Sequence, residues 1–273
     1  MSIGRAPLSL GCIVRQPVEV EQAATLAVDY LELKGDMLCV DAAALADLTA
    51  RVRATGLPAV SMTSPLPRRF RCRVVGADAD HEDALGVFTD MCDRAAPFGV
   101  QTVVLGSGQA RAIPAGFPRE RAVAQFREFV VRAAEVCRAR GMALTLEPLT
   151  AIETNFVNSC AEARPLVDEL AGAGVRIAVD CYHIVSEGRS VAEEVRIAAG
   201  AIGHAHTSSL PRGSMRFHTE VQTEFVASLI AAGYTGGLTI EEDFTDFARQ
   251  APLAVDTFRR ILSAPDSGTS TCD

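Results

Sequence analysis

The chain has 273 residues, of which 48% are hydrophobic, so it can bury a large core as one α/β domain or as two small ones. Its formal net charge of −8 and its pI of about 5.2 argue against a main role on nucleic acid, where binding needs clustered cations. No apolar run is long enough for a membrane span, and the first residues lack the hydrophobic segment of a signal peptide. We therefore expect a cytoplasmic protein that binds neither nucleic acid nor membranes.

Short apolar runs alternate with longer amphipathic stretches along the whole chain. One such stretch, residues 119–140, repeats its apolar residues at helical spacing and stops at Gly141. Its expected buried face consists of Ala122, Phe126, Phe129, Val130 and Ala133. The predicted strands are 8–14, 29–33, 59–63, 101–106, 143–147, 176–180, 201–206 and 237–241. Alternation of this kind indicates a parallel sheet covered by helices.

Eight strand–helix units in about 260 residues predict an α/β fold with a single (β/α)8 TIM barrel. A doubly wound open sheet is the alternative. We expect the barrel domain to span residues 1–264, because no linker interrupts this part of the chain. The last segment, 265–273, is rich in Ser, Thr and Asp, and we expect it to be a disordered tail.

Four consecutive predicted strands end on polar residues. Side chains alternate between the two faces of a strand, so "LTLE" and "LTIE" each place Thr and Glu on the face opposite their aliphatic residues. The last inward residues are then Glu147, Asp180, His206 and Glu241. His204 shares the face of His206 one layer deeper, where we expect a hydrogen-bonded core histidine. All four strand ends should converge at the C-terminal mouth of the barrel.

Three carboxylates held close together repel one another unless a cation neutralises them. Together with one imidazole they form a hard, oxygen-rich ligand set, which suits Mn²⁺ or Mg²⁺ and is compatible with Co²⁺. Two alternatives are a network of ion pairs with Arg and a one-residue shift of the last strand. That shift would bring Glu242 inward in place of Glu241.

The segments "LEPLTAIETN", "VDCYH", "GHAHTSSLPR" and "GYTGGLTIEED" resemble those of the xylose isomerase-like barrel family. Within it, their spacing is most similar to that of the ketose 3-epimerases, which act on sugars such as D-tagatose and D-psicose. The resemblance implies one metal held by Glu147, Asp180, His206 and Glu241. It also implies substrate contacts from Glu153, His183 and Arg212.

The resemblance implies a metal-dependent isomerase or epimerase that removes a proton next to a carbonyl of a polyol or ketose-like substrate. Glu147 and Glu241 would be the catalytic acid–base pair around an enediolate, with Mn²⁺ the best-suited metal. The chain has no Trp, whereas these epimerases typically wall the sugar with Trp. A dehydratase or other lyase of the inosose or dehydroshikimate type, or of secondary metabolism, is therefore the alternative. A non-catalytic barrel would be expected to lack some of the ligands, and homo-oligomerisation is left open.

Other polar segments indicate a role less specifically. Glu32 and Lys34 share the inward face of the second strand and could form an ion pair or touch substrate. The stretch "GSGQAR", 106–111, lacks the third Gly of a dinucleotide fingerprint and predicts a strand-to-helix loop. The basic run "RRFRCR", 68–73, either meets an anionic group of the substrate or lies on a solvated surface. His218 is more favourably placed than His81 to reach the pocket.

Overall fold

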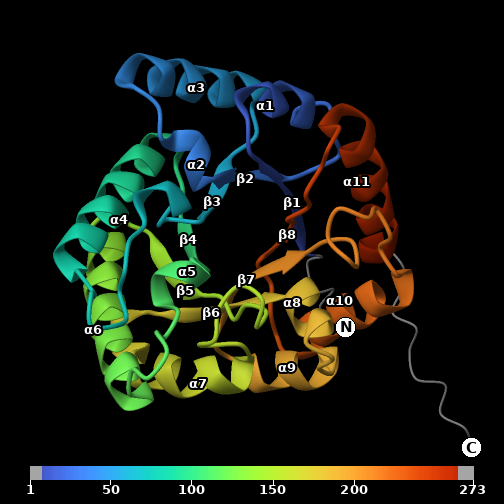
Figure 1. The fold of residues 1–273 in the computed structure, drawn as a ribbon. Helices are drawn as coiled ribbons and strands as arrows, with labels where there is room; N and C mark the ends of the chain where they lie inside the picture. Colours follow the sequence, from blue (N-terminus) through green and yellow to red (C-terminus); the bar gives the residue numbers. More distant parts are fainter. Residues whose placement is uncertain (1–7, 264–273) are drawn as a thin grey trace, which may run out of the picture.

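The computed structural model describes residues 8–263, in which eight parallel strands close into a barrel in chain order (Figure 1). β1 pairs with both β2 and β8, which closes the ring. The strands are β1 (Ser9–Val14), β2 (Tyr30–Lys34), β3 (Ala59–Thr63), β4 (Thr102–Leu105), β5 (Ala143–Leu146), β6 (Arg176–Asp180), β7 (Ile202–Thr207) and β8 (Gly237–Ile240). The predicted (β/α)8 barrel is confirmed with all eight strands, and the doubly wound alternative is wrong.

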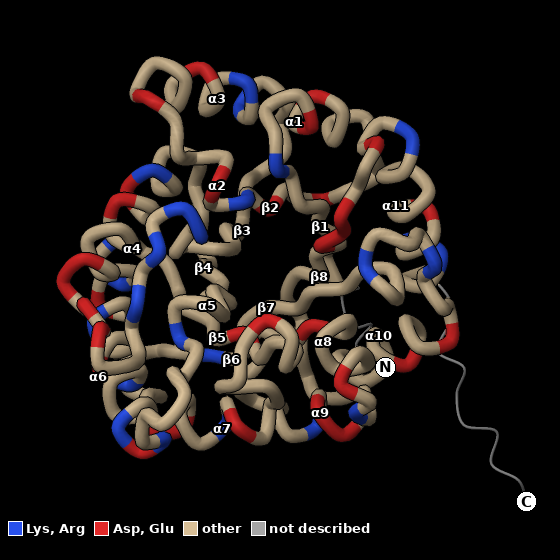
Figure 2. The backbone as a smooth tube through the Cα atoms, viewed as in Figure 1, with Lys and Arg blue, Asp and Glu red and all other residues tan. Residues whose placement is uncertain are grey.

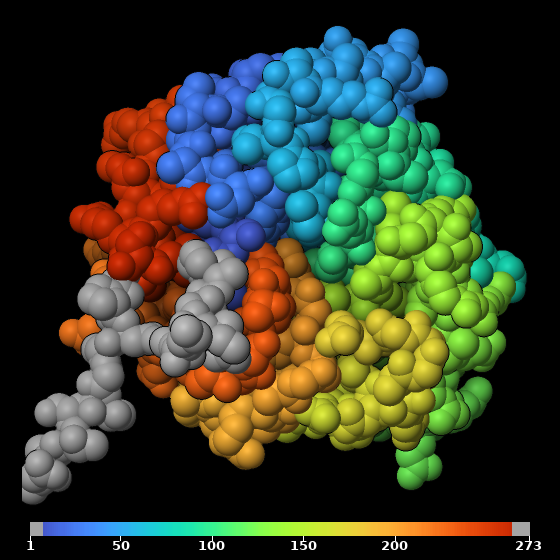
Figure 3. Space-filling model, turned by 180° about the vertical axis from the view of Figure 1, so that it is seen from behind, coloured from blue at the N-terminus to red at the C-terminus, as the bar shows by residue number. Residues whose placement is uncertain are grey.

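Helices surround the barrel in the order of the chain, so each strand–helix unit forms one sector of the molecule (Figures 1 and 3). Short helices α2, α5 and α8 follow their strands at the mouth. The helices are α1 (Pro17–Ala23), α2 (Gly35–Leu38), α3 (Ala42–Thr55), α4 (His81–Ala95), α5 (Gly108–Arg111), α6 (Arg119–Arg138), α7 (Cys160–Glu169), α8 (Cys181–Ser186), α9 (Val191–Ala198), α10 (Thr219–Ala231) and α11 (Phe247–Ser263).

The strands send their aliphatic faces to the helices, as the alternation predicts. Leu146 and Ile240 belong to the hydrophobic core between barrel and helices, whereas Thr145 and Thr239 are buried inside the barrel. The hydroxyl of Tyr30 lies 2.8 Å from Oγ1 of Thr239, so polar side chains inside the barrel find partners there. Alternation along the strands thus separates an apolar outer core from a barrel interior in which polar side chains lie beside apolar ones such as Ile13 and Val104.

Helix α6 shows how the outer layer is stabilised. Its predicted apolar stripe is buried, including Phe126 and Phe129. Phe129 meets Phe88 of α4 edge to face at a ring separation of 6.2 Å. Burial of each such side chain is worth on the order of 1.5–3 kcal/mol, so the stripe holds α6 against the barrel. Ser159 and Ser190 cap α7 and α9 by accepting hydrogen bonds from backbone N–H groups.

Charged residues of both signs alternate around the helical ring (Figure 2). Within residues 8–263, no helix combines the length and apolar character needed to cross a bilayer. The cysteines of this part of the chain are all free thiols. The tail predicted at 265–273 lies outside the described residues.

Candidate active site

Four side chains from consecutive strands meet at the C-terminal mouth of the barrel. The ligand atoms of Glu147, Asp180, His206 and Glu241 all lie within 4.8 Å of one another, and all four residues are buried. The register of β6 and β7 pairs Asp180 with His206, while Glu147 and Glu241 directly follow the last residues of β5 and β8. Strand register therefore produces the cluster that the alternation predicts.

The two nitrogens of His206 face different groups. Nδ1 lies 2.7 Å from Oε1 of Glu147 and 3.3 Å from Oε2 of Glu241, whereas Nε2 lies 2.9 Å from Oε1 of Glu32. Burial alone would lower the pKa of His206, but the surrounding carboxylates raise it well above its usual range. Nε2 of His206 and Oε1 of Glu32 lie close together without forming a hydrogen bond, and Nδ1 is left directed at the cluster.

Glu32 lies deeper in the barrel than the sequence suggests. Its Oε2 is 2.7 Å from Nε2 of His204, which is the predicted hydrogen-bonded core histidine. The possible ion pair between Glu32 and Lys34 does not form. Lys34 Nζ lies instead 3.6 Å from Oε1 of Glu241, and Glu32 pairs with His204. Residues two apart on a strand share a face but differ in depth by roughly 6.6 Å, which places Glu32 one layer below Lys34.

The two carboxylate oxygens of Asp180 contact different groups. Oδ1 accepts a hydrogen bond of 2.7 Å from the backbone N–H of Tyr182 and so caps α8. Oδ2 faces the site, 2.5 Å from Nη2 of Arg212 and 3.5 Å from Nε2 of His183. Burial raises the pKa of Asp180 despite the nearby cations. The cap fixes the carboxylate so that one oxygen remains available to the cluster.

Arg212 lies beside two members of the cluster. Its Nη2 is 3.4 Å from Oε2 of Glu241 in addition to its contact with Asp180. The guanidinium stacks over the ring of Tyr182 at 4.5 Å from the centroid, which restricts its orientation. Burial opposes ionisation of Glu241, but Arg212 and His206 hold its pKa well below the usual range. Glu241 is therefore ionised at neutral pH.

The loop that carries Arg212 is held by Glu242. This buried carboxylate accepts hydrogen bonds from the backbone N–H of Ser209 at 2.7 Å and from that of Gly213. The one-residue shift considered for the last strand is absent, because Glu241 faces the cluster and Glu242 faces the loop. Adjacent carboxylates on opposite faces thus serve the cluster and the loop.

Glu153 and His183 lie at the edge of the cluster. Nδ1 of His183 accepts a hydrogen bond of 3.3 Å from the backbone N–H of Thr150 and lies 3.7 Å from Oε1 of Glu153. Burial lowers the pKa of His183, so its ring is neutral at pH 7 and carries its proton on Nε2. The structure thus brings all seven predicted site residues together. His218 instead lies away from the cluster, with Nε2 3.0 Å from the carbonyl of Leu210.

Arg111 is a buried residue whose role the sequence did not indicate. Its guanidinium donates to the backbone carbonyls of Glu147 at 2.7 Å and Phe156 at 3.0 Å, joining the end of β5 to the following loop. Burial lowers its pKa to about 10, so it remains charged. A Cβ at Gly106 would lie 2.6 Å from Oε2 of Glu147, so a larger residue there would force this carboxylate to shift. The predicted strand-to-helix loop therefore positions Glu147.

The donor set fits a divalent metal ion. Three buried carboxylates and one imidazole nitrogen converge within ligand distance, and oxygen-rich sets of this kind suit hard cations. Oε2 of Glu147 lies directly against Gly106, so the glycine lets the carboxylate keep this position in the cluster. The elevated pKa of His206 reflects the same surplus of negative charge.

Comparison with known proteins agrees with the barrel fold. Residues 20–260 match the family model described as xylose isomerase-like TIM barrel. An L-ribulose 3-epimerase of Mesorhizobium japonicum is 27% identical over 112 residues, which are 41% of this chain and 38% of that protein. A 2-oxo-tetronate isomerase of Cupriavidus necator is 26% identical over 175 residues, 62% of this chain and 65% of that protein. Each match thus spans less than two thirds of the relative.

Solved structures show the same fold. The structure of D-psicose 3-epimerase with D-tagatose from Clostridium cellulolyticum H10 superposes with a TM-score of 0.77 at 19% identity. The superposition covers 94% of this chain and 100% of that chain. Because the family model matches well over half of its residues, the chain belongs to the xylose isomerase-like TIM barrel family.

Proposed function

We propose that this protein is a divalent-metal-dependent isomerase or epimerase that moves a proton next to a carbonyl of a polyol or ketose-like substrate. The observation that carries the proposal is the placement of two carboxylates, Glu147 and Glu241, against one imidazole nitrogen in a buried cluster. The names of the relatives, epimerases and an isomerase of sugar-like compounds, support the same reaction class.

Glu147, Asp180, His206 and Glu241 would hold one divalent ion, with Mn²⁺ the best-suited metal and Mg²⁺ or Co²⁺ compatible. When bound, the ion supplies positive charge beside the substrate oxygens on which negative charge develops. The protein's own side chains would supply the acid–base catalysis.

Proton transfer falls to the two Glu residues. Glu241 is ionised at neutral pH and can accept a proton from the carbon next to the carbonyl, leaving the bonding electrons in an enediolate. Glu147 approaches from β5, across the barrel mouth from β8; carrying a proton at the start of this direction, it can deliver that proton to the opposite face of the same carbon and is left ionised, while Glu241 is left protonated. That sequence inverts one centre, and the reverse sequence uses Glu147 as the base. Return of the proton to the neighbouring carbon gives isomerisation.

Glu153, His183 and Arg212 would orient the substrate hydroxyls. They lie along one side of the cluster and offer a carboxylate acceptor, a neutral imidazole and a guanidinium of fixed orientation. Such positioning groups lower the barrier by holding the reacting carbon against the base.

Arg212→Ala is expected to lower turnover of the true substrate by about 10- to 100-fold, because one charge-assisted contact is lost. Metal content should remain at the level of the unmodified protein, since Arg212 is not a ligand. Arg216→Ala, an exposed position in the same loop, is the matched control. Steady-state kinetics and metal analysis of both variants test the role, and unchanged kinetics in Arg212→Ala would remove this residue from the site.

The reaction class is tested by incubating the Mn²⁺-loaded protein in D₂O with ketoses, inososes and dehydroshikimate. NMR should show deuterium entering the carbon next to the carbonyl of at least one ketose, with no loss of water. Loss of water from an inosose or from dehydroshikimate would instead assign the dehydratase alternative. Absence of both exchange and water loss across the panel would contradict the proposed function.

A further inference from the structure

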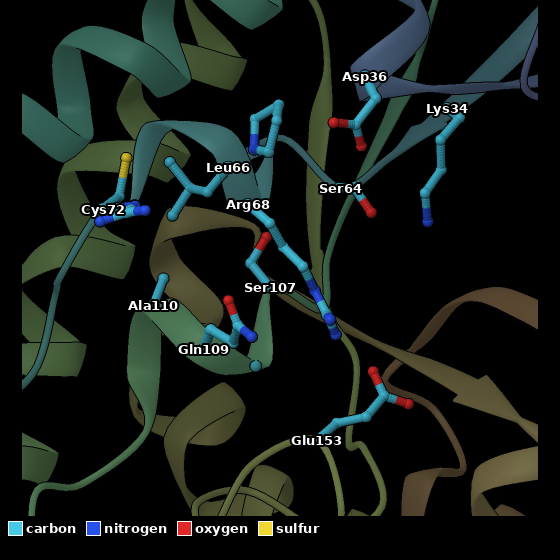
Figure 4. Close-up of a pocket in the computed structure, with 13 residues that line it drawn as sticks. Lys34, Asp36, Ser64, Leu66, Arg68, Cys72, Ser107, Gln109, Ala110 and Glu153 are labelled. Atoms are coloured by element: carbon cyan, nitrogen blue, oxygen red, sulfur yellow. The ribbon is translucent and has the colours of Figure 1, made fainter.

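A polar cavity of about 240 Å³ opens beside the candidate active site (Figure 4). It lies between the turn after β3, which contains the short helix η1 (Arg68–Phe70), and the loop that joins β4 to α5. Its lining includes Lys34, Ser64, Arg68, Arg71, Ser107 and Glu153. The basic run noted in the sequence therefore borders a cavity.

Two lining residues connect the cavity to the candidate active site. Lys34 Nζ lies 3.6 Å from Oε1 of Glu241, and Glu153 Oε1 lies 3.7 Å from Nδ1 of His183. Both side chains point into the cavity in Figure 4. A substrate held with its reacting carbon at the cluster would thus extend its far end into this space.

Arg68 has a charge that the described residues do not neutralise. Arg68 is solvent-exposed, and within residues 8–263 its guanidinium has no acidic partner within 4.0 Å and donates no hydrogen bond. The neighbouring Arg69 behaves differently, because its guanidinium donates to the backbone carbonyl of Cys39 at 3.0 Å and stacks on Phe70. Figure 4 shows the Arg68 side chain extending from its turn toward the middle of the lining residues, between Ser107 and Glu153.

Ser107 provides a second, independent sign of a ligand. Its hydroxyl oxygen is buried and has no hydrogen-bond partner among the described residues. Its backbone has a φ of 35°, in the left-handed region that non-glycine residues rarely adopt. Strained residues of this kind cluster at binding sites. A buried hydroxyl without a partner is costly unless a bound group supplies one.

The balance of charge in the cavity is positive. Lys34, Arg68 and Arg71 stand against two acidic residues, Asp36 and Glu153. Glu153 belongs to the side facing His183, where substrate hydroxyls would bind. The rest of the lining includes Asp36 and combines the Arg68 guanidinium with the hydroxyls of Ser64 and Ser107 and the amide of Gln109, donors that match the oxygens of an anion.

We infer that this cavity binds an anionic group, a carboxylate or a phosphate, at the end of the substrate remote from the reacting carbon. Arg68 would form the fork onto the anion, with Lys34 and Ser107 as supporting donors. The inference rests on the proposed function and narrows it, since the substrate becomes a charged derivative of a ketose or polyol.

Matched substrates test the inference by turnover. D-fructose, D-fructose 6-phosphate and D-fructuronate differ only in the group at the far end. We expect D-fructose 6-phosphate or D-fructuronate to be a better substrate than D-fructose. Arg68→Met should lower kcat/KM for that anion by about 10- to 100-fold, mainly by raising KM. Arg69→Met is the matched control and should change little. Equal loss for neutral and charged sugars in Arg68→Met, or a preference for D-fructose, would overturn the inference.

A binding experiment separates this inference from the proposed function. Calorimetric titration of the Mn²⁺-loaded protein with D-glucitol, D-glucitol 6-phosphate and D-gluconate needs no turnover. Tighter binding of one anion than of D-glucitol, lost in Arg68→Met and weakened in Ser107→Ala, supports the anion site even if no proton exchange occurs. If neither anion binds more tightly than D-glucitol, the anion site is disproved, whatever the exchange experiment shows.

Discussion

The double variant Asp180→Asn with His206→Ala is expected to purify without divalent metal, whereas the unmodified protein should hold about one ion per chain. The substitutions remove a carboxylate charge and the imidazole nitrogen from a set of four donors that lie within 4.8 Å of one another. Two carboxylates alone do not complete the coordination of a divalent ion. Metal analysis of dialysed protein gives the stoichiometry directly.

Thermal unfolding provides the second measurement for this variant. A ligand that binds only the folded state stabilises it by about 2.7 kcal/mol at a free concentration of 100 times Kd. Added Mn²⁺ should therefore raise the Tm of the unmodified protein and leave that of the double variant unchanged. The control is Asp36→Asn with His218→Ala, which changes the same residue types outside the cluster and should keep the metal. Retention of metal by the first variant would place the site elsewhere.

The strand order and the cluster were predictable because two local rules suffice for both. Alternation decides which side chains face the barrel, and parallel strands bring their carboxyl ends to the same mouth. Glu147 and Glu241 end runs with the same Thr-x-Glu pattern, Asp180 ends β6, and His206 is the next-to-last residue of β7. None of these assignments requires knowledge of a contact that is distant in the sequence.

The depth of His204 was predictable, but the partners of the residues that support the cluster were not, because these partners meet only through long-range contacts. Glu32 and His204 are 172 residues apart, and only the closed barrel places them 2.7 Å from each other. Arg111 binds the carbonyl of Glu147 across 36 residues from a segment that reads as an ordinary loop. A local pattern shows on which face of a strand a side chain lies. It does not show which side chains of other strands lie in the same layer of the barrel.

The two Glu residues are expected to act as bases in addition to binding metal, and substitution by Gln distinguishes the two roles. A residue that is only a ligand should be rescued by saturating Mn²⁺. Glu147→Gln and Glu241→Gln should instead each lose about 10²- to 10⁴-fold in rate at saturating metal, because the amide cannot accept a proton. Glu220→Gln, an exposed position on α10, is the control and should retain full activity.

In an epimerase each of the two carboxylates should act on a different face of the reacting carbon. Glu147 and Glu241 contact Nδ1 of His206 from different strands, so each can reach only one face of a carbon held between them. With substrates deuterated at the reacting carbon, Glu147→Gln should block loss of label from one epimer and Glu241→Gln from the other. NMR of each epimer in water with saturating Mn²⁺ measures this loss. Equal loss from both epimers in both variants would overturn the two-base mechanism and leave the carboxylates as ligands alone.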